Sequence, residues 1–250
     1  MNTIIMNFTH VYEPQDFYKE GTADTVVLDC SHISGTNCYC DEEAGRQLMK
    51  MMEKFGPKGL HFLDSGNYHY VSRLWLEQIK EDFELVVFDH HTDMQLPAFG
   101  DILSCGGWIK AALDGCERLK RVWLIGPPAL PEEEADERVC WLSEAQAEAF
   151  DTSRDASGRK EPFPVYISVD KDVFRLEDAR TNWDQGIMEL ERVLSLIRDI
   201  AASRPVIGMD VCGENPEAMD GPEADEVLEI NNRTNGRLLE AARKIFRQHA

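Results

Sequence analysis

Residues 84–93, ELVVFDHHTD, combine an apolar run with side chains that could bind a cation. The run predicts a buried strand, and Asp89, His91 and Asp93 follow it at a spacing of two. Side chains two residues apart point to the same side of an extended chain. They therefore offer two carboxylates and one imidazole to a positive ion. His90 is expected to point the other way, where a hydrogen-bonded histidine outside the site is the simpler interpretation.

Residues 165–172, VYISVDKD, repeat this plan with Asp170 and Asp172 after a predicted strand. Lys171 lies between the two acids and is expected to face away. In a chain with 46 acidic residues, such a pair alone predicts only solvated carboxylates at a strand end. Residue His69 follows a third strand-like run, LHFLD. By itself it is more typical of a hydrogen-bonded histidine than of a metal ligand.

The three segments become informative together, because ligands of open parallel sheets bind beyond the carboxyl ends of the strands. Four ionised carboxylates in one crevice (Asp89, Asp93, Asp170 and Asp172) would repel one another unless cations neutralised them. Oxygen-rich ligands with imidazoles suit manganese and, less selectively, iron, cobalt or zinc. Two such ions about 3.5–4 Å apart can share a water and hold it as hydroxide. The residues therefore predict a pair of divalent ions.

The segments that must position these residues alternate between β-branched or apolar runs and amphipathic stretches, which is typical of parallel strands linked by helices. Strands are predicted at Ile4–Phe8, Thr25–Asp29, Leu60–Asp64, Leu85–Asp89, Arg121–Ile125, Pro164–Asp170 and Pro205–Val211. Helices are predicted at Asp41–Lys54, Val71–Lys80, Gly107–Leu119, Ile187–Ala201 and Asn235–Gln248. Loops are expected at Pro127–Val139 and Asp151–Pro164. Neither loop separates two domains, so residues 1–250 are predicted to form one α/β domain.

Composition excludes several classes of function. With 26 Lys and Arg against 46 Asp and Glu, the formal net charge is −20, which argues against nucleic acid and anionic membrane surfaces as partners. The chain has no apolar run long enough for a membrane span and no export signal at its start. The seven cysteines are an odd number, and the C-x-C pair Cys38 and Cys40 has no second pair at metal-finger spacing. We therefore expect reduced thiols and a cytoplasmic protein.

The acidic blocks resemble those of the arginases, agmatinases and formiminoglutamases, the ureohydrolase family, and more remotely the histone deacetylases. Residues 89–93, DHHTD, resemble the family's D-A-H-x-D block, with Pro97 a few residues on. Residues 168–172, SVDKD, resemble its S-x-D-x-D block, and residues 67–70, NYHY, resemble its G-G-D-H segment. The three appear in family order, and the resemblance runs from about Val26 to the last helix. It implies a three-layer α/β/α sandwich around an eight-stranded, mostly parallel sheet.

The resemblance also implies a ligand set and a reaction. One manganese ion would be held by His69, Asp89, Asp93 and Asp170, and a second by Asp89, His91, Asp170 and Asp172. A hydroxide held by both ions would attack the planar carbon of a small cationic guanidino or amidino substrate and release an amine. Asp93 would carry the proton, and Gln95 is a candidate substrate contact. Relatives are often trimers or hexamers, so a homo-oligomer is a further expectation.

Several positions depart from the family pattern. Trp108 stands where the family has a proton-carrying histidine, and it could instead line the pocket or stack on a planar cation. Glu214, expected to contact the guanidinium, lies one place later than in the G-x-D-x-x-E-x-x-P block, so it either holds the substrate or is a surface acid near a turn. Residues 126–129, GPPA, replace the segment that reads the amino-acid end of arginine. A metal-binding relative without guanidine hydrolase activity and an amide deacetylase therefore stay open as alternatives.

Overall fold

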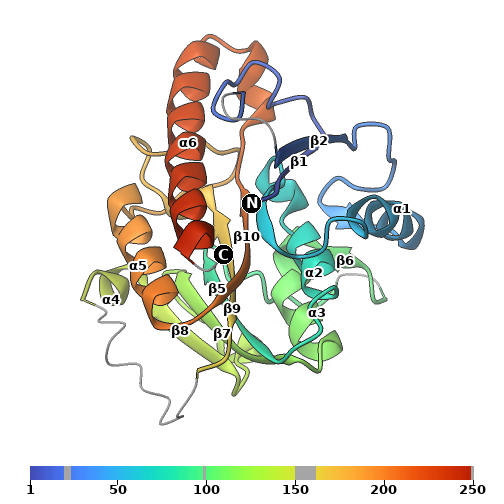
Figure 1. Cartoon of the computed structure of the whole chain (residues 1–250), viewed down its shortest axis with the longest axis vertical. Coiled ribbons are helices and arrows are strands. Elements are labelled where there is room, and N and C mark those ends of the chain that lie inside the picture. Colours follow the sequence, from blue (N-terminus) through green and yellow to red (C-terminus); the bar gives the residue numbers. More distant parts are fainter. Residues whose placement is uncertain (20–23, 98–99, 150–161, 249–250) are drawn as a thin grey trace.

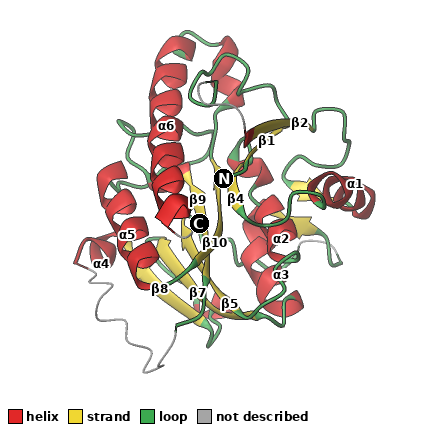
Figure 2. Cartoon of the chain, viewed as in Figure 1, coloured by secondary structure: helices red, strands yellow, loops and turns green. Residues whose placement is uncertain are grey.

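The computed structural model describes residues 1–19, 24–97, 100–149 and 162–248, and within them it contains a sheet of eight parallel strands (Figures 1 and 2). The strand order is β2-β1-β4-β10-β9-β5-β7-β8. The strands span Thr3–Asn7 (β1), Thr25–Asp29 (β2), Gly59–Phe62 (β4), Phe83–Phe88 (β5), Leu119–Gly126 (β7), Val139–Ser143 (β8), Val165–Asp170 (β9) and Val206–Cys212 (β10). The predicted eight-stranded parallel sheet is confirmed.

Helices cover both faces of the sheet, so the predicted three layers are confirmed (Figure 1). Residues of α1 (Glu42–Met52), α2 (Val71–Leu76) and α3 (Trp108–Gly115) pack into one core cluster. Residues of α4 (Glu144–Ala149), α5 (Leu190–Ser203) and α6 (Ala224–Gln248) pack into the other. Strand residues alternate between the clusters, as the two-residue period of a strand requires. In β5, for example, the residues at 85 and 87 join the first cluster and those at 86 and 88 join the second.

The strand missing from the sequence prediction is β8, which follows the predicted loop 127–139 and pairs with β7 at the edge of the sheet. Its residues are only partly buried, so it lacks the fully apolar pattern of the central strands. A second, two-stranded antiparallel sheet joins β3 (Tyr39–Cys40) to β6 (Leu103–Ser104). Short 3-10 helices span Gly66–Tyr68, Cys105–Gly107, Glu132–Glu134, Lys171–Val173 and Pro216–Asp220. Most of the predicted loop 151–164 lies outside the described residues.

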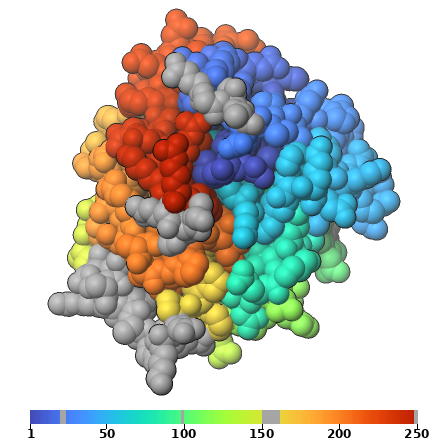
Figure 3. Space-filling model, viewed as in Figure 1, coloured from blue at the N-terminus to red at the C-terminus, as the bar shows by residue number. Residues whose placement is uncertain are grey.

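Helix α6 begins at Ala224, eleven residues before its predicted start at Asn235. The asparagines in this stretch are poor helix formers, but here their side chains make tertiary hydrogen bonds. Asn232 Oδ1 accepts from the backbone nitrogens of Asp16 and Phe17, both at 2.9 Å. The N-terminal segment consequently lies against the C-terminal helix, as the blue and red surfaces in Figure 3 show. Tertiary contacts, which the sequence pattern does not reveal, outweigh local propensity here.

The four strands β4, β10, β9 and β5 are adjacent and parallel, so their carboxyl ends meet at one edge of the sheet. The segments after β4, β5 and β9 carry the histidines and acids identified from the sequence. No helix within the described ranges has both the length and the apolar character needed to cross a bilayer.

Candidate metal centre

Three carboxylates surround one ring nitrogen of His69, which follows β4. The nitrogen Nδ1 lies 3.2 Å from Asp89 Oδ2, 3.0 Å from Asp93 Oδ2 and 3.4 Å from Asp170 Oδ2. All four side chains are buried. Two atoms that each bind one ion at about 2.0–2.2 Å and subtend about 90–110° lie roughly 3.0–3.5 Å apart. These separations are therefore those of ligands around a single ion.

A second group lies on the other side of Asp89. His91 Nδ1 is 2.8 Å from Asp172 Oδ2 and 3.7 Å from Asp89 Oδ1. The carboxylate of Asp89 thus turns Oδ2 toward His69 and Oδ1 toward His91. His69, Asp89 and Asp93 form one potential metal-ligand group, and Asp89, His91 and Asp172 form another. A carboxylate shared in this way is positioned to bridge two ions.

Two of the candidate ligand atoms, His69 Nδ1 and Asp89 Oδ2, are buried and make no hydrogen bond among the described residues, although they lie 3.2 Å apart. Leaving such atoms unpaired in a protein interior costs about 1–3 kcal/mol each, and more for a charged group. A cation between them would satisfy both. The ligand types and the unpaired atoms therefore fit a divalent metal pair.

Outer hydrogen bonds fix which nitrogen of each histidine faces the centre. His69 Nε2 lies 2.9 Å from Ser168 Oγ, and Ser168 donates its hydroxyl proton to Asp210 Oδ1 at 2.6 Å. Ser168 must therefore accept from Nε2–H, which leaves the Nδ1 lone pair of His69 for an ion. On the other histidine, His91 Nε2 lies 3.0 Å from Asp184 Oδ1. The arrangement at His91 matches the carboxylate-supported histidines of metal sites, whereas at His69 the serine hydroxyl lies between the imidazole and the carboxylate of Asp210.

Crowding of the acids shows in their ionisation. Burial, followed by the charges of Asp93 and Asp172, raises the pKa of Asp89 well above its usual value. Burial, followed by the charge of Asp172, likewise raises the pKa of Asp170. Both shifts disfavour the ionised forms, which a nearby cation would restore. Burial lowers the pKa of His91, but its hydrogen bond with Asp172 and the charges of Asp172 and Asp89 together outweigh burial and raise the pKa to about 10, so the imidazoles compensate only part of this negative charge.

The centre forms the floor of a cavity of about 310 Å³. Asp89, His91, Asp93, Asp170 and Asp172 all contribute to its lining. Gln95, predicted as a substrate contact, lines it too, together with residues of the β3 and β6 segments. Two partly exposed aromatic residues, Tyr39 at 45% and Trp183 at 41%, lie at the same cavity.

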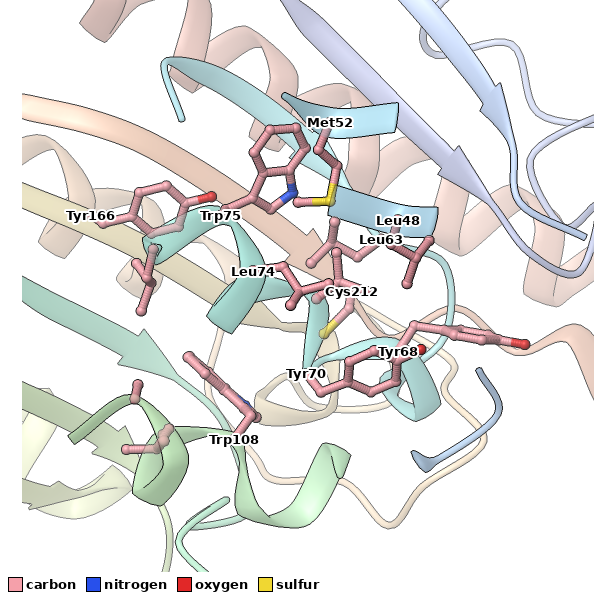
Figure 4. Packing of buried hydrophobic residues seen from close by; sticks show 14 of the residues in the cluster. Leu48, Met52, Leu63, Tyr68, Tyr70, Leu74, Trp75, Trp108, Tyr166 and Cys212 are labelled. Atoms are coloured by element: carbon pink, nitrogen blue, oxygen red, sulfur yellow. The ribbon is translucent and has the colours of Figure 1, made fainter. Parts of the chain in front are cut away.

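Trp108 does not occupy the place expected of it. It is fully buried and lies outside the cavity lining, so it cannot stack on a substrate. Its indole Nε1 donates to Asp93 Oδ2 at 2.6 Å, and its ring packs on His69 with centroids 4.7 Å apart. Figure 4 shows it within the packed core layer. The expectation of a pocket wall is corrected: Trp108 supports two metal-ligand candidates from behind.

Glu214 also lies away from the cavity. Its carboxylate is 1% exposed, pairs with Lys171 and accepts from Asn235 Nδ2 at 2.6 Å. The place where the family pattern expects glutamate is Gly213, whose φ is +93°. A Cβ there would lie 2.6 Å from Asp170 Oδ1, so no side chain fits. Neither the substrate contact nor the surface position expected of Glu214 is correct, because Glu214 is buried and paired with the ammonium group of Lys171.

The alternation arguments for the intervening residues agree with the structure. Lys171 points away from the metal-ligand candidates and is completely buried. The ring of His90 lies on the side of Glu144, 3.6 Å from its Oε1, while its backbone nitrogen donates to Asp172. Asp184 and Cys212 were not identified from the sequence. Asp184 lies in an irregular loop without a motif, whereas Cys212 could have been found as the residue two places after Asp210 in β10.

Comparison with known proteins identifies the family. The Arginase family model matches residues 18–228. An uncharacterized protein from Thermotoga maritima is 34% identical over 227 residues, covering 91% of this chain and 85% of its own.

Solved structures agree on the fold. A hypothetical agmatinase from Burkholderia thailandensis aligns over 98% of this chain and 87% of its own, with a TM-score of 0.63 and 16% identity. Proclavaminate amidino hydrolase from Streptomyces clavuligerus aligns over 97% and 92%, with a TM-score of 0.66 and 15% identity. A triple mutant of a T. brucei arginase-like protein, bound with Mn²⁺, aligns over 96% and 90%, with a TM-score of 0.63 and 16% identity. With the family match over most of its length, the chain belongs to the arginase family.

Proposed function

We propose that this protein is a hydrolase that cleaves a C–N bond of a guanidino, amidino or related small cationic substrate at a pair of divalent metal ions. The observation that carries the proposal is the carboxylate of Asp89, whose two oxygens face two different groups of potential ligands. Family membership supports a metal-dependent hydrolase. The oxygen-rich ligand set favours manganese at the position of His91.

The residues around the cavity have separable roles in this proposal. His69, Asp89, Asp93 and Asp170 would hold one ion, and Asp89, His91, Asp170 and Asp172 the other. When bound, such a pair activates water for attack on a planar carbon. Asp93 lies at the cavity with one oxygen held by Trp108. It is therefore placed to accept a proton from the attacking water and pass it to the leaving amine.

Recognition of the substrate would depend on the acidic floor and the aromatic rim. Tyr39 and Trp183 are the large aromatic side chains that the described part of the chain leaves substantially exposed, and both line this cavity. Their ring faces can attract an organic cation, by about 0.5–1 kcal/mol each at an exposed site. Gln95 adds an amide that can hydrogen-bond the substrate.

The test is a panel of guanidino, amidino and formimino compounds offered to the manganese-loaded protein, with release of urea, formamide and ammonia as the readout. Turnover that requires added metal is expected for at least one cationic compound. Silence across the panel by protein that holds two ions per chain would contradict the proposal.

One observation favours a second candidate. Because Gly213 leaves no room for a carboxylate and Glu214 is paired with Lys171, neither position can supply the glutamate that the family pattern places against a guanidinium. A metal-binding member without guanidine hydrolase activity, or an amide deacetylase, would need no such partner. Acetate release from acetylated polyamines would identify the deacetylase.

The proposal also covers location and assembly. We propose the cytoplasm as the compartment, where thiols such as those of Cys30, Cys40 and Cys212 stay reduced. Homo-oligomer formation stays a prediction, and size-exclusion chromatography with light scattering would measure it.

A further inference from the structure

Cys212 is the last residue of β10 and lies directly beside the metal-ligand candidates. Its sulfur is 3.1 Å from Asp170 Oδ2. The same oxygen is 3.4 Å from His69 Nδ1. One ligand atom from each of these three residues lies within 4.8 Å of the other two, and all three side chains are buried. The sulfur therefore lies close enough to bind the same ion as His69 and Asp170.

The sulfur-to-oxygen distance differs from those of other thiols in the chain. Cys30 and Cys40 contact backbone oxygens at 3.6 Å, and Cys38 contacts a side-chain oxygen at 4.0 Å. A sulfur bound to an ion at about 2.3 Å and an oxygen bound at about 2.1 Å, at a right angle, lie roughly 3.1 Å apart. The separation of Cys212 and Asp170 is that of an S–H···O hydrogen bond, and it also suits two ligands of one ion at a right angle.

Two independent features direct this sulfur to an ion. His69 Nδ1 and Asp89 Oδ2 are buried and make no hydrogen bond among the described residues although they lie 3.2 Å apart, as two ligand atoms of one cation would. The backbone next to Cys212 is also fixed, because Gly213 adopts a φ of +93° and packs so closely on Asp170 that a Cβ would overlap it. Cys212 belongs to the same packed layer as Trp108 (Figure 4). Its sulfur has little freedom to turn away.

We propose that Cys212 binds the ion at the His69 position through its sulfur, an inference that rests on the proposed metal pair. The sulfur makes that position select zinc, cobalt or iron over manganese. Sulfur is a soft ligand that favours these metals, whereas carboxylates and water suit manganese. On binding, the S–H bond breaks, a metal–sulfur bond forms, and the proton leaves to solvent. The group of Asp89, His91 and Asp172 contains no sulfur, so the two positions would differ in metal preference.

The test is a titration of the metal-free full chain with Co²⁺, followed by absorption spectroscopy and elemental analysis. A sulfur-to-cobalt charge-transfer band in the near ultraviolet is expected, and it should saturate at one equivalent per chain. Two bound cobalt ions without that band would overturn the sulfur ligand while leaving the metal pair intact. No cobalt bound by the wild type would overturn both this inference and the proposed function.

Two variants assign the band to one thiol. Cys212→Ser should lose the band and keep its far-ultraviolet circular dichroism. Cys105→Ser is the matched control, because Cys105 also lines the cavity but belongs to none of the potential ligand groups found among the described residues. It should keep the band. The reverse pattern would overturn the assignment to Cys212.

Competition between metals gives a readout that does not depend on the spectrum. Wild-type protein dialysed against equimolar Zn²⁺ and Mn²⁺ should retain zinc at one position. In Cys212→Ser, the preference for zinc over manganese should fall by roughly 10–100-fold, the size of effect known for groups that tune metal ligands. An unchanged ratio in folded Cys212→Ser would contradict the proposal.

Discussion

Two buried charged clusters lie on opposite sides of β9, and their charges are compensated in different ways. On one side, Lys171 and Glu214 pair with each other, and amides from Gln15, Asn231 and Asn235 donate to Glu214. On the other side, the acids around His69 and His91 contact these two imidazoles but no lysine or arginine of the described residues, and His69 Nδ1 and Asp89 Oδ2 make no hydrogen bond there. Successive residues alternate between these clusters: Asp170 and Asp172 belong to the acidic cluster, and Lys171 belongs to the cluster around Glu214.

The difference distinguishes a structural cluster from a functional one. Burying charge costs several kcal/mol per ion unless the surroundings compensate. Around Glu214 the compensation is built from the chain itself. Around Asp89 the chain supplies only the imidazoles of His69 and His91 against four carboxylates, which is why that cluster predicts a bound cation. The largest effect is therefore expected from a substitution that removes the bound metal ions.

Asp89→Asn should abolish metal binding at both positions, because this carboxylate faces both. Activity should fall by at least roughly 10³-fold, as when a group that stabilises charge in the transition state is removed. The same substitution should stabilise the metal-free chain, since the pKa of Asp89 is raised and its charge opposes folding at neutral pH. Elemental analysis, activity assays and urea unfolding in EDTA measure the three effects. Full metal content in Asp89→Asn would contradict the bridging role, and exposed Glu148→Gln is the control.

Lys171→Met should have the opposite effect on stability. Removing one partner leaves the Glu214 charge buried without a cation, which costs about 3–5 kcal/mol. The double variant Lys171→Met/Glu214→Gln should recover part of that loss, because glutamine is neutral and its one carbonyl oxygen can still accept the hydrogen bonds on one side. Denaturant unfolding measures both variants. If folded Lys171→Met lost its metal, the separation of the two clusters would be wrong.

Asp184→Asn should produce an intermediate effect. Asp184 contacts the outer nitrogen of His91, so its loss should weaken metal binding by roughly 10–100-fold. The weakening should be confined to the position of His91. Isothermal titration calorimetry resolves the two positions. Equal weakening at both would show that Asp184 acts on the whole fold.

At neutral pH the smallest effect concerns His61, which lies in β4 outside both charged clusters. Burial lowers the pKa of His61 to about 3, against an unfolded value of about 6.5. The unfolded chain therefore binds an extra proton between these values, and stability falls as pH falls through that window. The slope from this residue is at most about 1.4 kcal/mol per pH unit.

The difference between wild type and His61→Gln isolates this slope, because Asp64 and Asp210, whose pKa values burial raises to about 6, act with the opposite sign in both proteins. Urea unfolding of metal-free protein at several pH values measures it. Parallel stability curves for the two proteins would contradict the assignment to His61.

Sequence patterns predicted the regular part of the molecule and the ligand candidates. Alternation along β5 and β9 correctly placed Asp89, Asp170 and Asp172 on one side and Lys171 on the other, because the two-residue period is a local property. The hydrogen-bond and ion-pair partners of the buried polar residues could not be predicted from the sequence. The pairing of Lys171 with Glu214 joins residues 43 apart across neighbouring strands, and it depends on the turn at Gly213.

Trp108 and α6 were misjudged for a related reason. A tryptophan can line a pocket or fill a core, and only the packing of α3 decides which. The asparagines of α6 argue against a helix by local propensity, but their contacts with the N-terminal segment stabilise one. Local sequence patterns thus predicted the strands and helices and the sides on which their residues lie. Long-range contacts determined which partners the individual polar residues have.

The metal content of the wild-type chain tests the central claim most directly. Protein stripped with EDTA, reloaded with an equimolar mixture of Mn²⁺ and Zn²⁺, and freed of excess metal should contain two divalent ions per chain by inductively coupled plasma mass spectrometry. A folded chain that retains none would show that the acids around Asp89 tolerate one another without cations, which would contradict the account.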